Sequence, residues 1–286
     1  KNYSSLSNEN KQLVYNIVIE NNKFQLKNKS FEELNSYFKN KIFNNGTTLF
    51  CFWQKGKPVG TIGAIVKDVI YKGEIFLTAI NIDEKQIETF LPSYLMVEEY
   101  IRLFDPKYIK LGISHYKEYL IPYIEKLGFI NPYYLYEMSC NTIEIKKIPS
   151  DFYMENLTEK NKENYKEINN SAFLSCPNGG IVSSDDLDSF IADYKEKPDL
   201  IGIFKYQNKP IGTFELSLTD KIGTIDSIGI STKYQGKGMG KILLEAVIEK
   251  LKQHGAEIIK LNVISTNIKA YNIYLKYGFV QDKIIS

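Results

Sequence analysis

Residues 234–247, which read YQGKGMGKILLEAV, combine three glycines and two lysines with the start of a helical pattern. The glycines are Gly236, Gly238 and Gly240, and the lysines are Lys237 and Lys241. Glycine disfavours a helix by roughly 1 kcal/mol relative to alanine, so its repeated use here needs another reason. The first N–H groups of a helix have no partner within it and carry a partial positive charge. Bare backbone lets them close around an anion, and the stretch therefore predicts a phosphate-binding turn between a strand and a helix.

The glycine spacing separates this turn from two other phosphate-binding loops. It is not a Walker A loop, because no Gly-Lys-Ser/Thr sequence ends it. It also lacks the G-x-G-x-x-G spacing of the dinucleotide fingerprint. For the glycines taken alone, a flexible loop without a ligand is the alternative interpretation.

A second motif follows in residues 267–279, which read NIKAYNIYLKYGF. Together with the Gln-x-x-Gly-x-Gly pattern of residues 235–240, it closely resembles the GNAT-type N-acetyltransferase superfamily. The two best motifs of that family are a Gln/Arg-x-x-Gly-x-Gly/Ala loop and an Asn-x-x-Ala-x-x-(Leu/Ile)-Tyr-x-x-x-Gly-Phe helix. Both are present in order, with an expected strand between them. The resemblance covers about residues 200–280 well and the first half of the chain more weakly.

The resemblance implies that the chain binds acetyl-CoA as a co-substrate. Backbone N–H groups of the loop would hold the pyrophosphate; its residues are Gln235, Gly236, Lys237, Gly238, Met239 and Gly240, with Lys241 adjacent. The pantetheine arm would hydrogen-bond to the backbone of Ile228, Gly229 and Ile230 as an added strand does. Gly229 would leave room for that arm. Asn267 matches an asparagine of the family that contacts the cofactor.

Two catalytic roles are also implied. Tyr274 matches the tyrosine beside the cofactor sulfur, and its ordinary pKa of about 10 makes it a proton donor to the leaving thiolate. Core packing is the alternative role for this tyrosine. The acceptor amine must lose a proton, which calls for a base. Asp226, two residues from Ile228 and so expected on the same strand face, and Glu215 on the neighbouring strand are the two candidates.

An internal repeat predicts the domain organisation. The segment GKPVGTIGAI (56–65) resembles NKPIGTFELS (208–217), YIKLGIS (108–114) resembles IIKLNVIS (258–265), and YIEKLGF (123–129) resembles IYLKYGF (273–279). The offsets are 150 to 152 residues throughout. We therefore expect an α+β chain of two GNAT-like domains, residues 1–145 and 146–286, packed against each other. Each would hold a mixed, mostly antiparallel twisted sheet flanked by helices, with a central β-α-β-α unit.

The first copy lacks the residues tied to the cofactor. At an offset of 148, Gly236, Gly238 and Gly240 fall on Glu88, Phe90 and Pro92. At an offset of 150, Tyr274 falls on Ile124 and Asn267 falls on Lys117. A carboxylate, a bulky ring and a proline do not suit an anion cradle. The first domain is therefore expected not to bind acetyl-CoA in the usual way.

The second copy ends soon after Phe279, whereas the first continues with INPYYLYEMSCNTIEI after its own Gly-Phe. The second sheet is therefore expected to have lost a strand, to receive one from the other domain, or to be completed by residues beyond the tail.

The amino-acid composition limits the classes of partner and binding site that the chain is expected to have. Lys plus Arg total 36 and Asp plus Glu 34, a net charge of +2, which argues against a nucleic-acid partner. Three cysteines without paired spacing fit a reduced, cytoplasmic setting. The two histidines lie far apart, so no metal site is expected, and no apolar run reaches the length of a membrane span.

The sequence thus predicts an N-acetyltransferase in which a primary amine, on a small molecule or a peptide, attacks acetyl-CoA directly in a ternary complex. Cys176 alone, without a nearby histidine, is weak support for a covalent acyl-enzyme. A non-catalytic acyl-CoA sensor is the alternative function.

Overall fold

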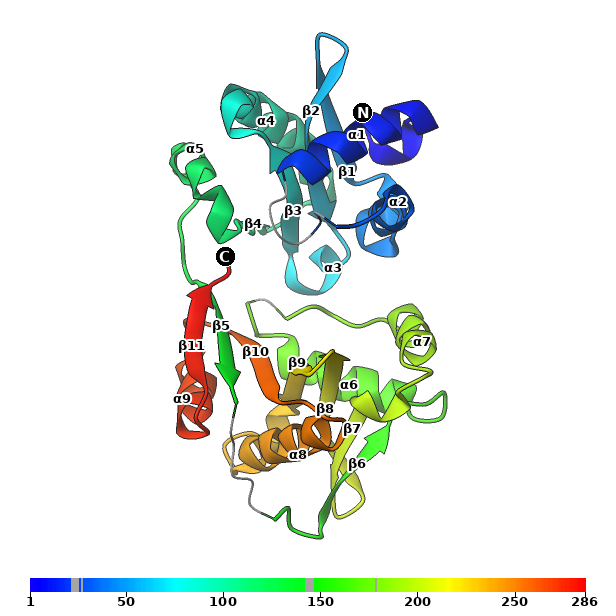
Figure 1. The fold of residues 1–286 in the computed structure, drawn as a ribbon, viewed down its shortest axis with the longest axis vertical. Coiled ribbons are helices and arrows are strands. Elements are labelled where there is room, and N and C mark those ends of the chain that lie inside the picture. Colours follow the sequence, from blue (N-terminus) through cyan, green and yellow to red (C-terminus); the bar gives the residue numbers. More distant parts are fainter. Residues whose placement is uncertain (22–25, 27, 142–146, 178) are drawn as a thin grey trace. The chain divides into compact units, whose positions relative to one another are not determined.

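The computed structural model describes residues 1–21, 26, 28–141, 147–177 and 179–286. Contacts divide the chain into two compact units, residues 1–131 (unit 1) and 132–285 (unit 2) (Figure 1). The domain boundary expected at residues 145 and 146 lies outside the described residues. The division falls earlier than expected because strand β5 (Leu135–Cys140) pairs within the sheet of unit 2.

Unit 1 contains a four-stranded sheet in the order β1-β2-β3-β4. Its strands are β1 (Leu49–Gln54), β2 (Lys57–Ile65), β3 (Glu74–Ile82) and β4 (Tyr108–Leu111). Its helices are α1 (Asn8–Asn21), α2 (Phe31–Phe38), α3 (Val69–Lys72), α4 (Phe90–Ile101) and α5 (Ile121–Lys126). Only the β3–β4 pair is parallel. Cys51 packs in a cluster with α1 and α2, and its neighbour Phe52 in a second cluster with α4 and α5, as the alternation of side chains along a strand requires.

Unit 2 contains a seven-stranded sheet in the order β11-β5-β10-β9-β8-β7-β6. Its remaining strands are β6 (Phe152–Asn156), β7 (Ile201–Tyr206), β8 (Lys209–Thr219), β9 (Ile222–Ile230), β10 (Ile258–Ile264) and β11 (Val280–Ile284). Its helices are α6 (Lys162–Phe173), α7 (Ser184–Asp193), α8 (Met239–Gln253) and α9 (Ile268–Lys276). The apolar face of α8, including Leu243, Val247 and Leu251, packs on the sheet in the main cluster. A second cluster joins α6 and α7 to the sheet.

Strand β5 completes the second sheet with residues that follow the first repeat. It lies between β10 and β11 and is antiparallel to both (Figure 1). Met138 at its centre is fully buried in the main cluster of unit 2. Of the three expectations for the missing strand, the structure supports the second, because the strand comes from the domain expected at residues 1–145.

The repeat found in the sequence is a structural repeat. Shifting β9 by the predicted 148 residues gives residues 74–82, which is β3, and shifting β7 by 152 gives residues 49–54, which is β1. Helix α4 likewise overlaps the shifted position of α8. The two units therefore share the order of three antiparallel strands, a helix, a parallel strand and a helix, as predicted.

Candidate functional site

The turn between β9 and α8 holds its glycines in conformations that other residues rarely adopt. Gly236 has a φ of +78° and Gly238 a φ of +79°. A Cβ built on either residue would meet no atom within 4 Å, so internal packing does not require glycine there. The backbone angles do require it, and the space in front of the backbone is open to a ligand.

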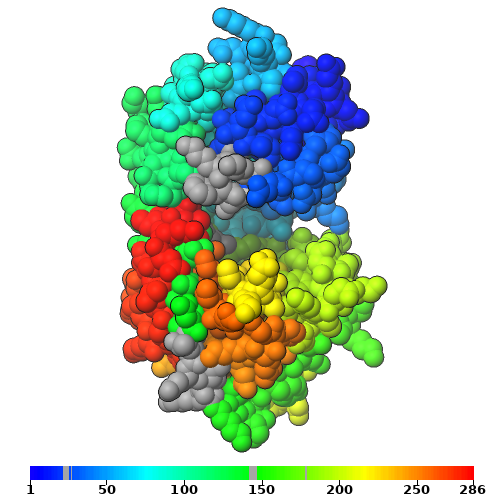
Figure 2. All heavy atoms as spheres, viewed as in Figure 1, coloured from blue at the N-terminus to red at the C-terminus, as the bar shows by residue number. Residues whose placement is uncertain are grey.

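The start of α8 is suited to an anion. Helix α8 begins at Met239 with Gly238 as its N-cap, and no described side chain caps its first N–H groups or places an acid in its first turn. Lys237 and Lys241 are exposed beside it, and part of α8 lies at the surface of unit 2 (orange in Figure 2). Free N–H groups and two cations therefore meet at one exposed turn.

Strands β9 and β10 separate on the side of this turn. They pair from Ile222 with Ile258 to Ile225 with Leu261, and their register ends there. Beyond it, β9 stays bonded to β8, and the N–H of Ser231 donates to the carbonyl oxygen of Ile211 at 2.9 Å. Because backbone groups alternate along an antiparallel ladder, those of Ile228 and Ile230 point to the other side. We call the space they border, between β9 and β10, the slot; an extended group can add there as a strand does.

Gln235 ties the turn to the slot. Its Nε2 donates to the carbonyl oxygen of Ile230 at 2.8 Å. The side chain therefore acts within the protein and fixes the start of the glycine turn to the end of β9.

Gly229 was expected to leave room for the pantetheine arm, and the contacts of this residue contradict that reason. A Cβ on Gly229 would lie 2.8 Å from the ring of Phe173 and 2.9 Å from the Cβ of Ala172. Those residues end α6, on one face of the sheet, whereas the slot lies beside β9 within the sheet. Glycine at this position makes room for α6 rather than for an arm in the slot.

The last helix places two of the predicted residues. Asn267 is the N-cap of α9, and its side chain accepts from the N–H of Ala270 at 3.2 Å. Tyr274 is partly buried, with its ring centre 5.8 Å from that of Phe279. Burial raises the pKa of Tyr274 to about 12, so its hydroxyl keeps its proton at neutral pH. Contact of either residue with a cofactor stays a prediction.

A β-bulge in β9 affects the positions of the two candidate bases, Glu215 and Asp226. Glu215 pairs with Ser227 and Leu216 with Ile225, so Asp226 is an extra residue in β9. The simple alternation used to place Asp226 on the face of Ile228 therefore does not run through this point. Burial, followed by the negative charge of Asp226, raises the pKa of Glu215. Burial also raises the pKa of Asp226, against a hydrogen bond from Ser217 that lowers it.

Tyr194 is a residue of this site that sequence reasoning missed. It follows α7, and its hydroxyl donates to Oε1 of Glu215 at 3.3 Å. No local motif marks it, because the contact joins residues 21 positions apart through the packing of α7 on β8.

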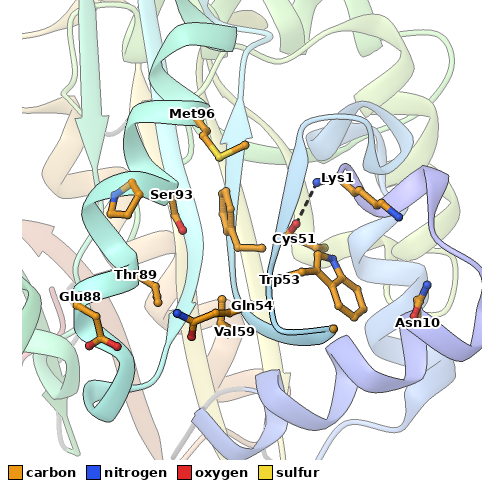
Figure 3. Close-up of a pocket in the computed structure, with 13 residues that line it drawn as sticks. Lys1, Asn10, Cys51, Trp53, Gln54, Val59, Glu88, Thr89, Ser93 and Met96 are labelled. Atoms are coloured by element: carbon orange, nitrogen blue, oxygen red, sulfur yellow. Dashed lines mark hydrogen bonds between the residues drawn. The ribbon is translucent and has the colours of Figure 1, made fainter.

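Unit 1 has different groups at the corresponding turn. A short 3-10 helix, Glu84–Thr89, leads into α4 without the positive-φ glycines of unit 2. Glu88, Thr89 and Pro92 instead line a hollow of about 720 Å³ together with Trp53 and Gln54 of β1 (Figure 3). The residues lining this hollow come from β1, β2 and the helices beside them, so it is not the counterpart of the slot.

In unit 1, side chains bond to the backbone at the counterpart of the slot, and a hollow of about 100 Å³ remains there, lined in part by Ile80, Asn81 and Lys117. The carbonyl oxygens of Ile80 and Ile82, which match Ile228 and Ile230, accept from Lys117 Nζ and from the Tyr119 hydroxyl. The Tyr119 contact is 2.7 Å long. Asn81, which stands where unit 2 has Gly229, accepts from the same Nζ at 3.1 Å and is buried. We call this group, Asn81, Lys117 and Tyr119, the unit 1 seal.

The unit 1 seal gives a prediction about stability. Burial lowers the pKa of Lys117 from 10.5 to about 8. Between pH 8 and pH 10.5, Lys117 is neutral in the folded protein but still protonated in the unfolded chain. The free energy of unfolding of the wild-type protein should therefore rise with pH over this range, relative to that of Lys117→Met. The rise should approach 3 kcal/mol, from roughly 1.4 kcal/mol per pKa unit.

Urea unfolding of both proteins at pH 7, 8, 9 and 10 measures this difference. Below pH 8 the difference should be constant, because Lys117 is protonated in both states. A difference that stays constant up to pH 10 would contradict a buried amine with a lowered pKa.

Comparison with known sequences identifies the class of unit 2. Residues 154–279 match the Acetyltransferase (GNAT) family. A mycothiol acetyltransferase of Propionibacterium freudenreichii subsp. shermanii is 23% identical over 137 residues, 46% of this chain and 44% of that protein. A spermine/spermidine N(1)-acetyltransferase of Bacillus subtilis is 34% identical over 84 residues, 28% of this chain and 53% of that protein. The chain spans about half the length of these curated relatives.

Solved structures extend the similarity to the whole fold. A GCN5-related N-acetyltransferase from Sphaerobacter thermophilus has a TM-score of 0.64 at 14% identity, covering 89% of this chain and 83% of that one. A tandem GNAT protein from the clavulanic acid biosynthesis pathway has a TM-score of 0.60 at 8% identity, covering 98% of this chain and 94% of that one. Unit 2 therefore contains a domain that matches the GNAT acetyltransferase family over residues 154–279, and the fold of the chain is similar to that of a tandem GNAT protein.

The described residues contain no group of three or more His, Cys, Asp or Glu side chains that could hold a metal ion. No helix among them is long and apolar enough to cross a membrane.

Proposed function

We propose that unit 2 transfers an acetyl group from acetyl-CoA to a primary amine. One observation carries the proposal: the uncapped start of α8, behind two positive-φ glycines, stands at the end of the slot beside Ile228 and Ile230. A diphosphate and the extended arm attached to it need these two features side by side. The match to the GNAT family agrees with this ligand.

Each part of the site has a proposed role in binding or in the transfer. The N–H groups of Gly236, Gly238 and Gly240 and of the first turn of α8, with Lys237 and Lys241, would hold the pyrophosphate. Backbone groups of Ile228 and Ile230 would hold the arm. When bound, acetyl-CoA supplies an activated thioester. Tyr274 would hydrogen-bond the departing sulfur, and a carboxylate on β8 or β9 would take the amine proton.

The acceptor is proposed to be an amine that enters as an ammonium ion. Asp226 and Glu215 lie close enough for the charge of one to raise the pKa of the other, and a cation between them would relieve that repulsion. Two of the relatives are named as a mycothiol acetyltransferase and a spermine/spermidine N(1)-acetyltransferase, so the acceptor panel should include spermidine, amino sugars and peptide N-termini.

Unit 1 is proposed not to bind acetyl-CoA. Its turn offers a carboxylate at Glu88, and side chains of the unit 1 seal bond to the backbone at the counterpart of the slot. Its role would then be structural or in shaping the acceptor.

Calorimetry with acetyl-CoA, paired with thiol release against the amine panel, tests both proposals. One binding site per chain and amine-dependent thiol release are expected. Binding without release across the panel would favour the acyl-CoA sensor, and two equal sites per chain would overturn the assignment of unit 1.

A further inference from the structure

We propose that Glu215 is the carboxylate that accepts the proton of the acceptor amine, and that Tyr194 is the residue that positions it. This inference rests on the acetyl transfer proposed above. It chooses between the two bases that the sequence left open, and it adds a residue that no motif marks.

The surroundings of Glu215 favour it over Asp226. Glu215 is partly buried in the middle of β8, and a hydrogen bond from Tyr194, 3.3 Å long, fixes its Oε1. Asp226, on the bulge of β9, has the more exposed residue surface, although burial raises the pKa of its carboxyl and Ser217 hydrogen-bonds to it. Glu215 is therefore the less exposed of the two carboxylates, and less screening by water favours it as the base.

The position of Glu215 fits the direction of the slot. Glu215 pairs with Ser227, directly before the residues that border the slot. The slot narrows there, because β9 and β10 begin to pair at Ile225 and Leu261. An arm that enters from the glycine turn therefore ends near the level of Ser227, with Glu215 one strand away. Adjacent strands lie roughly 4.8 Å apart, so an arm in the slot and the backbone of β8, with β9 between them, lie roughly 10 Å apart, and the Glu215 side chain together with a water would have to span that gap.

The step balances as follows. The neutral amine nitrogen attacks the thioester carbonyl carbon and forms the C–N bond, and the C–S bond breaks. The acceptor, which binds as an ammonium ion, gives its first proton through the water to Glu215 before this attack, and the second proton, released from the nitrogen as the amide forms, passes to solvent. The sulfur leaves as a thiolate hydrogen-bonded to Tyr274.

Two groups, Tyr194 and Asp226, set the proton affinity of Glu215 together with burial. Tyr194 at the end of α7 lowers its pKa through the hydrogen bond, and Asp226 on β9 raises it through its charge, while burial raises it further. Tyr165 on α6 also lies within electrostatic range of Glu215, but it makes no hydrogen bond to it in the described structure. Asp193, beside Tyr194, acts on that tyrosine.

Tyr194→Phe is the deciding variant, because it removes the hydrogen bond and keeps the ring. The acid limb of the kcat/KM profile should move to higher pH by half a unit or more, roughly the size of one neutral hydrogen bond. Asp226→Asn should move the same limb to lower pH, because it removes the negative charge that raises the pKa of Glu215. Tyr165→Phe, the matched control, should leave the limb in place, and all three variants should bind acetyl-CoA with wild-type affinity.

The titration of Glu215 itself, followed by carboxyl carbon NMR, needs no acceptor and should show the same order of shifts. Abolished turnover in Asp226→Asn with an unmoved limb in Tyr194→Phe would assign the base to Asp226 and overturn the inference. An equal loss of rate at every pH in Tyr194→Phe would make Tyr194 merely structural. Failure of the wild-type protein to bind acetyl-CoA would refute the proposed function instead, which the calorimetry above reports separately.

Discussion

Gly238→Phe should abolish acetyl-CoA binding to unit 2. Gly238 has a φ of +79°, which costs a residue with a Cβ roughly 1–2 kcal/mol. The ring would also occupy the open space in front of the first N–H groups of α8, where a Cβ now meets no atom within 4 Å. Loss of two charge-assisted hydrogen bonds, at roughly 1.5–3 kcal/mol each, corresponds to at least a 100-fold weaker affinity. Calorimetry with acetyl-CoA measures it.

The chain offers a matched control at the other end of the same helix. Gly255 follows α8, has a φ of +90°, and a Cβ there would also have no neighbour within 4 Å. Gly255→Phe should therefore impose a similar backbone strain, and a similar loss of thermal stability, without touching the predicted cradle. If both variants lose binding alike, the effect comes from a weakened α8 and not from the anion site.

The sequence could predict the features that depend on residues close together in the chain. Gly236 and Gly238 act through their own backbone angles, and α9 carries its N-cap and its apolar face within a few residues. The repeat added the strand order of both units, because similar apolar patterns at a constant offset fold alike. These parts of the prediction were confirmed by the fold.

The features that were missed arise from long-range packing. The pairing of β5 with β10 was one of three open expectations, because it joins residues more than 100 positions apart and no local pattern chooses among them. The bulge at Asp226 depends on how β8 and β9 fit together, so a period of two placed that side chain incorrectly. Gly229 was assigned to the ligand because the approach of Phe173 has no signal in the sequence near it.

In unit 1, side chains donate to the carbonyl oxygens of Ile80 and Ile82, which match Ile228 and Ile230 of unit 2. Loss of the glycines alone would leave the backbone of Ile80 and Ile82 open beside the separating strands, with unpaired polar groups. Lys117 and Tyr119 satisfy those carbonyls from the segment after β4. In the sequence, Lys117 stands where the second repeat has Asn267, which indicates only that a cofactor-binding residue is absent. The structure adds that Lys117 Nζ donates to the carbonyl oxygen of Ile80.

Tyr274→Phe should lower kcat by roughly 100-fold, the low end for general-acid assistance, while the affinity for acetyl-CoA stays within a factor of about two. A thiol has an ordinary pKa of about 8.5, well below the value of about 12 to which burial raises that of Tyr274. Complete proton transfer to the thiolate is therefore uphill, and the hydroxyl acts mainly as a hydrogen-bond donor to the sulfur as its charge develops. Its ionisation should cause no loss of rate below about pH 11.

The control for this variant lies one turn earlier on the same helix. The hydroxyl of Tyr271 donates to the side chain of Gln281 at 3.1 Å, and nothing assigns it to the sulfur. Tyr271→Phe should keep full turnover. Full turnover in Tyr274→Phe would remove its catalytic role, and a parallel fall in affinity and rate would mean that the hydroxyl supports the packing of α9 against Phe279 rather than the departing thiolate.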